Sequence, residues 1–249
     1  MIQKYIPQEP LVDLEYQHFK IKNKRVMLPR YLSQKLAYYV GYLQGDGCIE
    51  SNLKRVDFID EHRRQLECIN DLTYDLFNIS GNIRERFPSL SKKAVYTLEI
   101  GSVDIHKFLQ KVFSIPVGVK RNLSIPHQMY KNDELMVWYL RGLFDADGTL
   151  PKDASSVKQP FLDITLKDRE FIEEIQKVLK SFGIITLKPY KRVAKSPHSD
   201  FISETWELRI RKRADMINFI NKIGFFSENK ANRIVPLLKR LNALVAQHG

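Results

Sequence analysis

The first half of the chain switches between two spacings of its apolar residues. Between Leu36 and Leu43 they recur every three or four positions, which predicts a helix over 33–45. Val56 and Phe58 alternate with polar neighbours, as residues of a half-buried strand do. In the rest of this half, the same patterns predict short strands within 48–60, a helix at 63–78, a hairpin at 81–101 and a helix at 103–113.

The second half repeats this order of elements. It is predicted to contain a helix at 133–145, strands within 149–166, a helix at 168–181, a hairpin at 184–212, a helix at 213–223 and a last helix at about 227–246. Pro236 falls inside that last helix or at a break in it. Each half reads helix, two strands, helix, two strands, helix, which predicts an α+β fold of two similar half-domains. We expect an N-terminal extension at 1–30, half-domains at 31–115 and 133–249, and a linker at 116–132 marked by Pro116, Gly118 and Pro126.

Two short motifs recur in the same order in the two halves. LAYYVGYLQGDGCIE at 36–50 aligns with VWYLRGLFDADGTLP at 137–151, an offset of 101 residues. A second pattern, K-x-N-x-x-[IV]-P, begins at Lys120 and again at Lys230, an offset of 110. Ordered repeats of this kind indicate an internal duplication of one structural unit.

The first motif predicts a close helix pair with an acidic end. Each copy carries two small residues four positions apart, which allows two helices to pack closely against each other, and each then ends in Asp-Gly. Gly47 and Gly148 are expected to take the left-handed conformation that ends a helix. Asp46 and Asp147 would then lie near one axis, where they repel each other and the negative helix ends.

Such a pair of carboxylates predicts a bound cation. Carboxylate and backbone carbonyl oxygens suit Mg²⁺, which also favours substrate phosphates. The alternative is that Asp-Gly is only a turn after a core helix, but the duplication of the motif favours the metal site. The six histidines show no metal-ligand spacing, so no metal role is predicted for them.

Composition narrows the class of protein. The 249 residues include 40 Lys+Arg and 29 Asp+Glu, a formal net charge of +11 at pH 7, which indicates a polyanionic partner such as nucleic acid. The two cysteines, Cys48 and Cys68, exclude a disulfide framework or a Cys-rich zinc site and fit a reducing compartment. The sequence has no long apolar run and no secretory signal at Met1, so we expect an intracellular protein without a membrane span.

The second copy of the motif, LRGLFDADG at 140–148, resembles the namesake peptide of the LAGLIDADG homing endonucleases. YVGYLQGDG at 39–47 is a looser match, with Gln44 where an acidic residue is common, and the linker phrase from Gly118 to Pro126 is also similar to that of intein-associated members. The resemblance implies a pseudo-symmetric pair of αββαββα units in one monomeric chain. The motif helices would form the domain interface, and two antiparallel sheets would form a saddle over double-stranded DNA.

The resemblance also implies a catalytic site. Asp46 and Asp147 would bind the catalytic Mg²⁺ ions, for which Mn²⁺, or Ca²⁺ without catalysis, would substitute. The backbone carbonyls of Gly45 and Ala146 would contribute to the same metal site. The resemblance points to Lys120 and Lys230 as the lysines near each scissile phosphate.

Two other interpretations of these lysines stay open. They are alternatively solvated basic residues, with Asn122 and Asn232 acting as helix caps. Lys212 competes for the catalytic role in the second half, although the first half has no lysine at the matching place.

Basic residues on the predicted strands are candidates for DNA recognition, because alternate residues of a strand face one way and a β-ribbon fits the major groove. They are Arg55, Arg84, Arg86, Lys92, Lys152, Lys188, Lys191, Arg192, Arg209, Arg211 and Lys212. Any one of them is more typical of a phosphate contact or a solvated charge than of a base contact.

The sequence therefore predicts a metal-dependent, site-specific endonuclease that cuts both strands of a long asymmetric DNA site and, by resemblance, leaves short 3′ overhangs. A non-cleaving nucleic-acid binder or an intron RNA maturase of the same fold is the first alternative, and a DNA-binding regulator is another. The chain lacks the terminal Cys, Ser or His-Asn of a protein-splicing element, so self-splicing is not expected. Whether residues 1–30 contact DNA or the protein body stays open.

Overall fold

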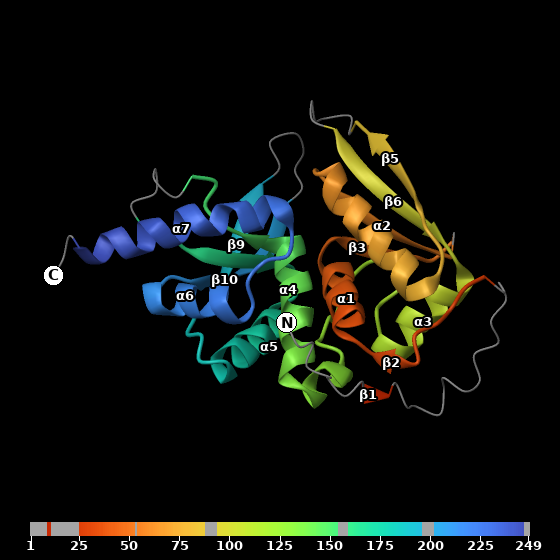
Figure 1. The fold of residues 1–249 in the computed structure, drawn as a ribbon, viewed down its shortest axis with the longest axis horizontal. Coiled ribbons are helices and arrows are strands. Elements are labelled where there is room, and N and C mark those ends of the chain that lie inside the picture. Colours follow the sequence, from red (N-terminus) through yellow and green to blue (C-terminus); the bar gives the residue numbers. More distant parts are fainter. Residues whose placement is uncertain are drawn as a thin grey trace, which may run out of the picture. The chain divides into compact units, whose positions relative to one another are not determined.

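The computed structural model describes residues 9–10, 25–52, 54–87, 94–153, 159–195 and 202–246. By internal contacts the chain divides into two units (Figure 1). Unit 1 comprises the described residues within 1–120 together with 126–139, and unit 2 comprises 121–125 and the described residues from 140 onward.

Unit 1 contains a four-stranded antiparallel sheet and three long helices. Its elements are α1 (Gln34–Asp46), β3 (Gly47–Glu50), β4 (Arg55–Asp60), α2 (Arg63–Phe77), β5 (Asn82–Arg86), β6 (Val95–Gly101), α3 (Val103–Phe113), the short η2 (His127–Lys131) and the first part of α4 (Asp133–Asp147). The strand order is β3-β4-β6-β5. A separate two-stranded pair joins β1 (Glu9–Pro10) to β2 (Tyr31–Leu32).

One face of this sheet is covered by helices. α1, α2 and α3 all contact its strands, and α2 runs beside β6 (Figure 1). Aromatic rings fill the space between the layers: Tyr39 packs edge-on against Phe58 and Phe77 with ring centroids 5.3 and 5.5 Å apart, and Phe77 meets Phe108 at 5.9 Å. These four rings are fully buried, so they anchor the core that holds α1 in place.

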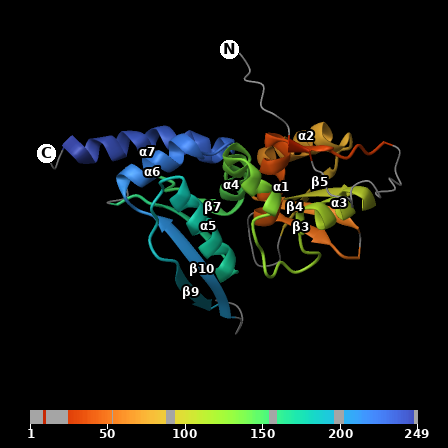
Figure 2. The ribbon, with the colours of Figure 1, turned by 90° about the horizontal axis from the view of Figure 1, so that it is seen from below.

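Unit 2 repeats this architecture. Its elements are the second part of α4, β7 (Gly148–Thr149), β8 (Leu162–Leu166), α5 (Arg169–Ser181), β9 (Tyr190–Lys195), β10 (Ile202–Ile210), α6 (Arg213–Lys222) and α7 (Glu228–Ala246). The strand order is β7-β8-β10-β9. α5 lies alongside β10 (Figure 2) and buries Phe171, Ile172, Ile175 and Leu179, while Phe144 of α4 packs on Phe219 of α6 at 4.7 Å.

The two sheets have the same topology, which confirms the predicted fold class of duplicated αββαββα halves. In each half a motif helix leads directly into the first strand, and the first glycine of that strand pairs with an apolar residue of the second: Gly47 with Phe58, and Gly148 with Ile164. The predicted helices agree with the observed ones to within a few residues, whereas the second hairpin begins at Tyr190 rather than at 184. Pro236 lies inside α7. None of the helices in the described ranges is long and apolar enough to cross a membrane.

The prediction that Gly47 and Gly148 end their helices in a left-handed conformation is wrong. Gly47 is extended, with φ −96° and ψ 169°, and Gly148 is not among the glycines with positive φ. A Cβ at Gly47 would clash with the Leu43 side chain, and one at Gly148 would lie 2.5 Å from the Phe144 carbonyl oxygen. Glycine is therefore required for space, because the chain passes from helix to strand directly over the last helical turn.

Candidate functional site

The site in unit 1 is the C-terminal end of α1. Ser33 caps the start of this helix, where its hydroxyl accepts a hydrogen bond from the Leu36 amide at 3.2 Å. The helix is buried from Leu36 to Gln44 and ends at the half-buried Asp46. The last carbonyls of a helix have no partners within the helix and form the negative end of its dipole. A carboxylate at this end makes the site strongly attractive to a cation.

Lys120 supplies a positive charge at this helix end. Its Nζ donates to the carbonyl oxygen of Gln44 at 2.9 Å and to that of Gly45. The approach of the lysine is set by β3, because Val117 bridges Ile49 in parallel and the Gly118 amide donates to the Ile49 carbonyl at 2.8 Å. The loop then turns at Gly118, whose φ of +79° favours glycine, and carries Lys120 back to α1.

Unit 2 holds the matching arrangement at the end of α4. The helix ends at the half-buried Asp147. Lys230 Nζ donates to the carbonyls of Phe144 at 2.9 Å, Asp145 at 2.5 Å and Ala146 at 3.0 Å. Each unit thus brings its predicted catalytic lysine to the carbonyls that immediately precede its predicted metal-binding aspartate.

Lys230 is positioned by a helix rather than by a loop. It lies near the start of α7, and Asp145 of α4 holds the two residues that immediately precede this helix. Asp145 is only 2% exposed, and its Oδ2 accepts hydrogen bonds from the Phe226 and Ser227 amides, both at 2.9 Å. A carboxylate at a helix N-terminus is favoured by the helix dipole.

A role for Asp145 is not apparent from the sequence alone. The available signal was the difference between the two motif copies, since unit 1 has Gln44 at the matching place. Gln44 is also buried, and its Oε1 accepts a hydrogen bond from the Tyr139 hydroxyl at 2.5 Å. The two motif copies therefore use this position for different contacts.

The donor set fits a hard divalent cation. Each helix end offers an aspartate and backbone carbonyl oxygens, the ligand types of Mg²⁺. The carbonyl oxygens of Gly45 and Ala146 each accept a hydrogen bond from a lysine ammonium group, so they face a position where positive charge is stabilised. Within the described ranges, no three His, Cys, Asp or Glu side chains gather into a metal-binding group, so any ion here relies on the aspartates, carbonyls and a substrate.

The other interpretations of the lysines involve Lys212, Asn122 and Asn232, none of which lies at the end of a motif helix. Lys212 is the exposed N-cap residue of α6, and it starts a helix rather than lying at the end of a motif helix. Asn122 adopts φ +53° in a loop and Asn232 lies inside α7, so neither caps the start of a helix. The helix-cap interpretation of these asparagines is wrong.

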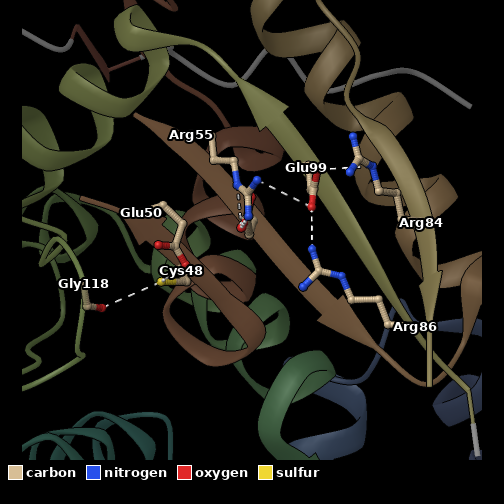
Figure 3. A network of polar contacts seen from close by, with 8 residues as sticks. Cys48, Glu50, Arg55, Arg84, Arg86, Glu99 and Gly118 are labelled. Atoms are coloured by element: carbon tan, nitrogen blue, oxygen red, sulfur yellow. Dashed lines mark hydrogen bonds and ion pairs between the residues drawn. The ribbon is translucent and has the colours of Figure 1, made fainter. Parts of the chain in front are cut away.

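The sheet face opposite the helices carries many of the predicted DNA-binding arginines. In unit 1 the side chains of Arg55, Arg84 and Arg86 converge on Glu99 of β6 (Figure 3), with N–O distances of 3.6, 3.4 and 2.6 Å. Arg55 also pairs with Asp57 at 2.8 Å. At the edge of the same face, the Cys48 sulfur lies 3.7 Å from the Gly118 carbonyl (Figure 3).

Unit 2 has a related cluster on its own sheet. Glu207 of β10 is fully buried and binds Arg192 at 2.9 Å and also Arg209. The Arg209 guanidinium stacks over the Phe161 ring at 3.8 Å. Lys191, by contrast, pairs with the exposed Glu204 at 2.8 Å. The acidic partners in both units were missed by sequence analysis, because only the strand register brings them to the arginines.

The remaining predicted DNA-binding residues lie on the surface. Lys152, Lys188, Arg211 and Lys212 are exposed, and Arg211 donates to Gln159. Lys92 lies outside the described residues.

Burial perturbs the acids of the two sheets. Burial raises the pKa of Asp57, although the Arg55 hydrogen bond opposes the shift. Burial and the nearby Glu207 charge raise the pKa of Asp163 to about 6. For Glu207 itself, burial raises the pKa, but hydrogen bonds from Tyr190 and Arg209 outweigh it and leave the pKa lowered.

The fold is a duplicated αββαββα unit, and each copy has an aspartate and a lysine at the end of its motif helix. These features define a class of proteins that contain two copies of one motif. A family model described as "LAGLIDADG-like domain" matches residues 33–112 and 134–224. The chain belongs to the LAGLIDADG homing endonuclease family.

Curated relatives match mostly as parts of longer proteins. The glutamine–fructose-6-phosphate aminotransferase of Methanocaldococcus jannaschii is 28% identical over 220 residues, which cover 88% of this chain and 19% of that protein. The replication factor C small subunit of the same organism is 23% identical, over 91% of this chain and 12% of that protein. Homing endonuclease I-ApeI of Aeropyrum pernix is 26% identical, over 60% of this chain and 64% of its own length. The chain thus spans a fifth or less of the first two relatives.

Solved structures share the fold at low identity. I-WcaI bound to its DNA recognition sequence superposes with a TM-score of 0.54 at 13% identity, covering 87% of this chain and 96% of its own. I-DmoI in complex with DNA and Ca gives 0.53 at 16% identity, covering 82% and 98%.

Proposed function

We propose that this protein is a metal-dependent, site-specific endonuclease that cuts both strands of DNA. The observation that carries the proposal is the repeated helix end, where a half-buried aspartate follows carbonyls that hold a lysine ammonium. The arrangement occurs once with Asp46 and Lys120 and once with Asp147 and Lys230. A reaction with one event on each of two strands needs two such groups.

The proposed chemistry is phosphodiester hydrolysis. Asp46 and Asp147, with the carbonyls of Gly45 and Ala146, would hold Mg²⁺. The ion would lower the pKa of the attacking water and neutralise charge on the phosphate. Lys120 and Lys230 stand by these ligands, where an ammonium group stabilises the negative charge that develops on phosphate oxygens. The lysine proton is also available to the leaving oxygen.

Double-stranded DNA is the proposed partner. The net charge of +11 favours a polyanion, and the arginines of both sheets lie on the face opposite the helices. I-WcaI and I-DmoI, which share the fold, were solved with DNA. Among the described residues, Glu99 pairs with three arginines and Glu207 with two. The two halves therefore present unlike surfaces, and we expect one chain to bind an asymmetric site.

The partial matches to curated proteins fit a mobile element. An aminotransferase and a replication factor share no common activity, yet this chain matches a limited part of each, 19% and 12% of their lengths. A segment found within such different proteins is best explained as an insertion. We therefore propose that this chain descends from an inserted element whose endonuclease promotes its spread.

A cleavage selection tests this proposal. The protein is incubated with a plasmid library that carries randomised inserts, in Mg²⁺ or in EDTA, and cut molecules are sequenced. We expect discrete double-strand cuts in Mg²⁺, none in EDTA, and a loss of at least about 10³-fold in rate for Asp46→Asn and for Asp147→Asn. Asp75→Asn, which changes an exposed acid paired with Lys35, is the matched control and should cut like the wild type.

The opposite result is equally clear. Tight DNA binding without cutting in any divalent ion would contradict the nuclease and favour a non-cleaving binder. An RNA maturase would instead show splicing of an intron substrate that depends on the protein.

A further inference from the structure

A buried glutamate lies beneath the arginines on the open face of each sheet. Glu99 is 9% exposed, whereas the Arg84 and Arg86 side chains above it are 63% and 53% exposed. In Figure 3 the guanidinium groups of these two residues and of Arg55 point toward Glu99. In unit 2, Glu207 is 0% exposed and Arg192 above it is 58% exposed.

The two glutamates occupy different places in their sheets. Glu99 lies opposite Asp57 in the pairing of β4 with β6. In unit 2 the residue opposite Asp163 is Arg209, and Glu207 lies two residues away, opposite Thr165. The arrangement of buried acid and exposed arginine is therefore built at a different register in each half, and it directs the arginines to different positions on the two surfaces.

A buried ion pair often contributes no more to folding stability than an apolar pair of the same size. Stability alone therefore does not explain why a glutamate is buried here. A positioning role explains the arrangement more directly. A guanidinium has five N–H donors in a fixed plane, so a glutamate that takes one or two of them leaves the rest for another acceptor. An arginine that is already held loses less side-chain freedom when it binds.

The geometry points to Glu99 and Glu207 as positioning residues for DNA sequence recognition, each fixing the arginines of its own sheet in the orientation that reads base edges. This inference rests on the proposed function, since it assumes that DNA binds this face. The glutamates also offset the arginine charge, which weakens the attraction of the same arginines to phosphates of any sequence. Each glutamate should therefore raise selectivity within the part of the site that its own unit contacts.

The test uses the full chain and a library of randomised duplexes of about 30 base pairs, bound in Ca²⁺ and sequenced after selection. The variants are Glu99→Gln and Glu207→Gln, which keep the shape and a hydrogen-bond acceptor but lose the charge. Glu85→Gln and Glu170→Gln are matched controls, because they make the same charge change at exposed acids, one in each unit. Affinity for a mixed-sequence duplex is measured at several salt concentrations.

We expect each test variant to lose base preference by about tenfold at a cluster of neighbouring positions, a different cluster for Glu99→Gln and for Glu207→Gln. Its affinity for the mixed-sequence duplex should rise about threefold, with a steeper salt dependence, because the freed arginines contact phosphates. The controls should keep the wild-type base preference. A purely structural role would lower the melting temperature without moving base preference at selected positions.

The inference is overturned if the test variants and the controls keep the same base preference. If Glu99→Gln does not fold, Arg86→Lys provides the second variant, since it retains the charge and removes the planar fork. It should relax a subset of the positions in one cluster, and unchanged preference would contradict the inference. A wild-type protein that binds no duplex would instead overturn the proposed function, whereas binding with preference in all variants alike overturns this inference alone.

Discussion

The two units place a lysine at the end of a motif helix by different routes. In unit 1 the chain after α3 follows the edge of β3, turns at Gly118, and delivers Lys120 from a loop. In unit 2 Lys230 comes from a helix, α7, whose start is held by the buried Asp145. A loop in one unit and a helix in the other bring a lysine ammonium group to the same kind of helix end. The feature that the duplicated K-x-N motif retains is therefore the position of the ammonium group rather than the local backbone structure.

Removing each lysine tests whether the ammonium group at the helix end contributes to cleavage, and this change should produce the largest effect. We expect Lys120→Ala and Lys230→Ala each to lower the rate of Mg²⁺-dependent cleavage by about 10²–10³-fold, because an ammonium that stabilises developing phosphate charge is lost. Lys212→Ala, at the exposed start of α6, should stay within about threefold of the wild type. The rates are measured on the plasmid selected in the cleavage assay. Equal losses of cleavage rate for Lys212→Ala and Lys230→Ala would show that contact with the helix-end carbonyls does not identify the catalytic lysine.

Substitutions at one aligned motif position, Gln44 in unit 1 and Asp145 in unit 2, test how each unit holds its lysine in place. Asp145→Ala leaves two amides at the start of α7 without their acceptor, and Gln44→Ala removes the acceptor of the Tyr139 hydroxyl. Each should lower the free energy of unfolding by about 2 kcal/mol. Only Asp145→Ala should also slow cleavage, by about tenfold, because it loosens the helix that carries Lys230.

The contrast between these two variants arises from the atoms involved. Lys120 binds the backbone carbonyl of Gln44, which a side-chain substitution retains. Unfolding is followed by chemical denaturation, and cleavage is measured at a temperature where both variants are folded. Slower cleavage by Gln44→Ala together with normal cleavage by Asp145→Ala would reverse the assignment.

Asp57 and Asp163 pair across the sheet with the residue that follows each motif glycine. These two acids should give the units different pH responses, the smallest effect predicted. Burial and the Glu207 charge raise the pKa of Asp163 to about 6, so folded protein retains a proton that unfolded protein releases. The contribution of Asp163 to stability is therefore full below about pH 4 and is lost as the pH rises to about 6. Because the pKa of the neighbouring Glu207 is lowered and acts in the opposite direction, we expect the net loss to be on the order of 1 kcal/mol.

Asp163→Asn should remove this pH dependence. Relative to the wild type, its melting temperature should rise by about 2–4 °C between pH 4 and pH 7. Asp57, the matching acid of unit 1, has a pKa raised by burial but is paired with Arg55 at 2.8 Å, so Asp57→Asn should show a weaker trend. Parallel melting curves for wild type and Asp163→Asn over this range would contradict the assignment.

Much of the fold could be predicted from the sequence, because apolar periodicity alone delimits amphipathic helices such as α5 and the strands on which they pack. The aspartates and lysines of the candidate site also emerged, since each occurs twice at a fixed spacing. The conformation of Gly47 did not, because a need for space and a need for positive φ both select glycine. Nor did the roles of Asp145, Glu99 and Glu207, which depend on which strand or helix lies beside them.

Metal binding to the two motif aspartates is the central claim. The most direct measurement titrates Mn²⁺ into a complex with the selected DNA and follows bound ion by electron paramagnetic resonance. We expect Asp46→Asn and Asp147→Asn each to weaken Mn²⁺ binding, and we expect the double variant to retain no specifically bound Mn²⁺. A double variant that binds Mn²⁺ with the stoichiometry and affinity of the wild type would contradict the account.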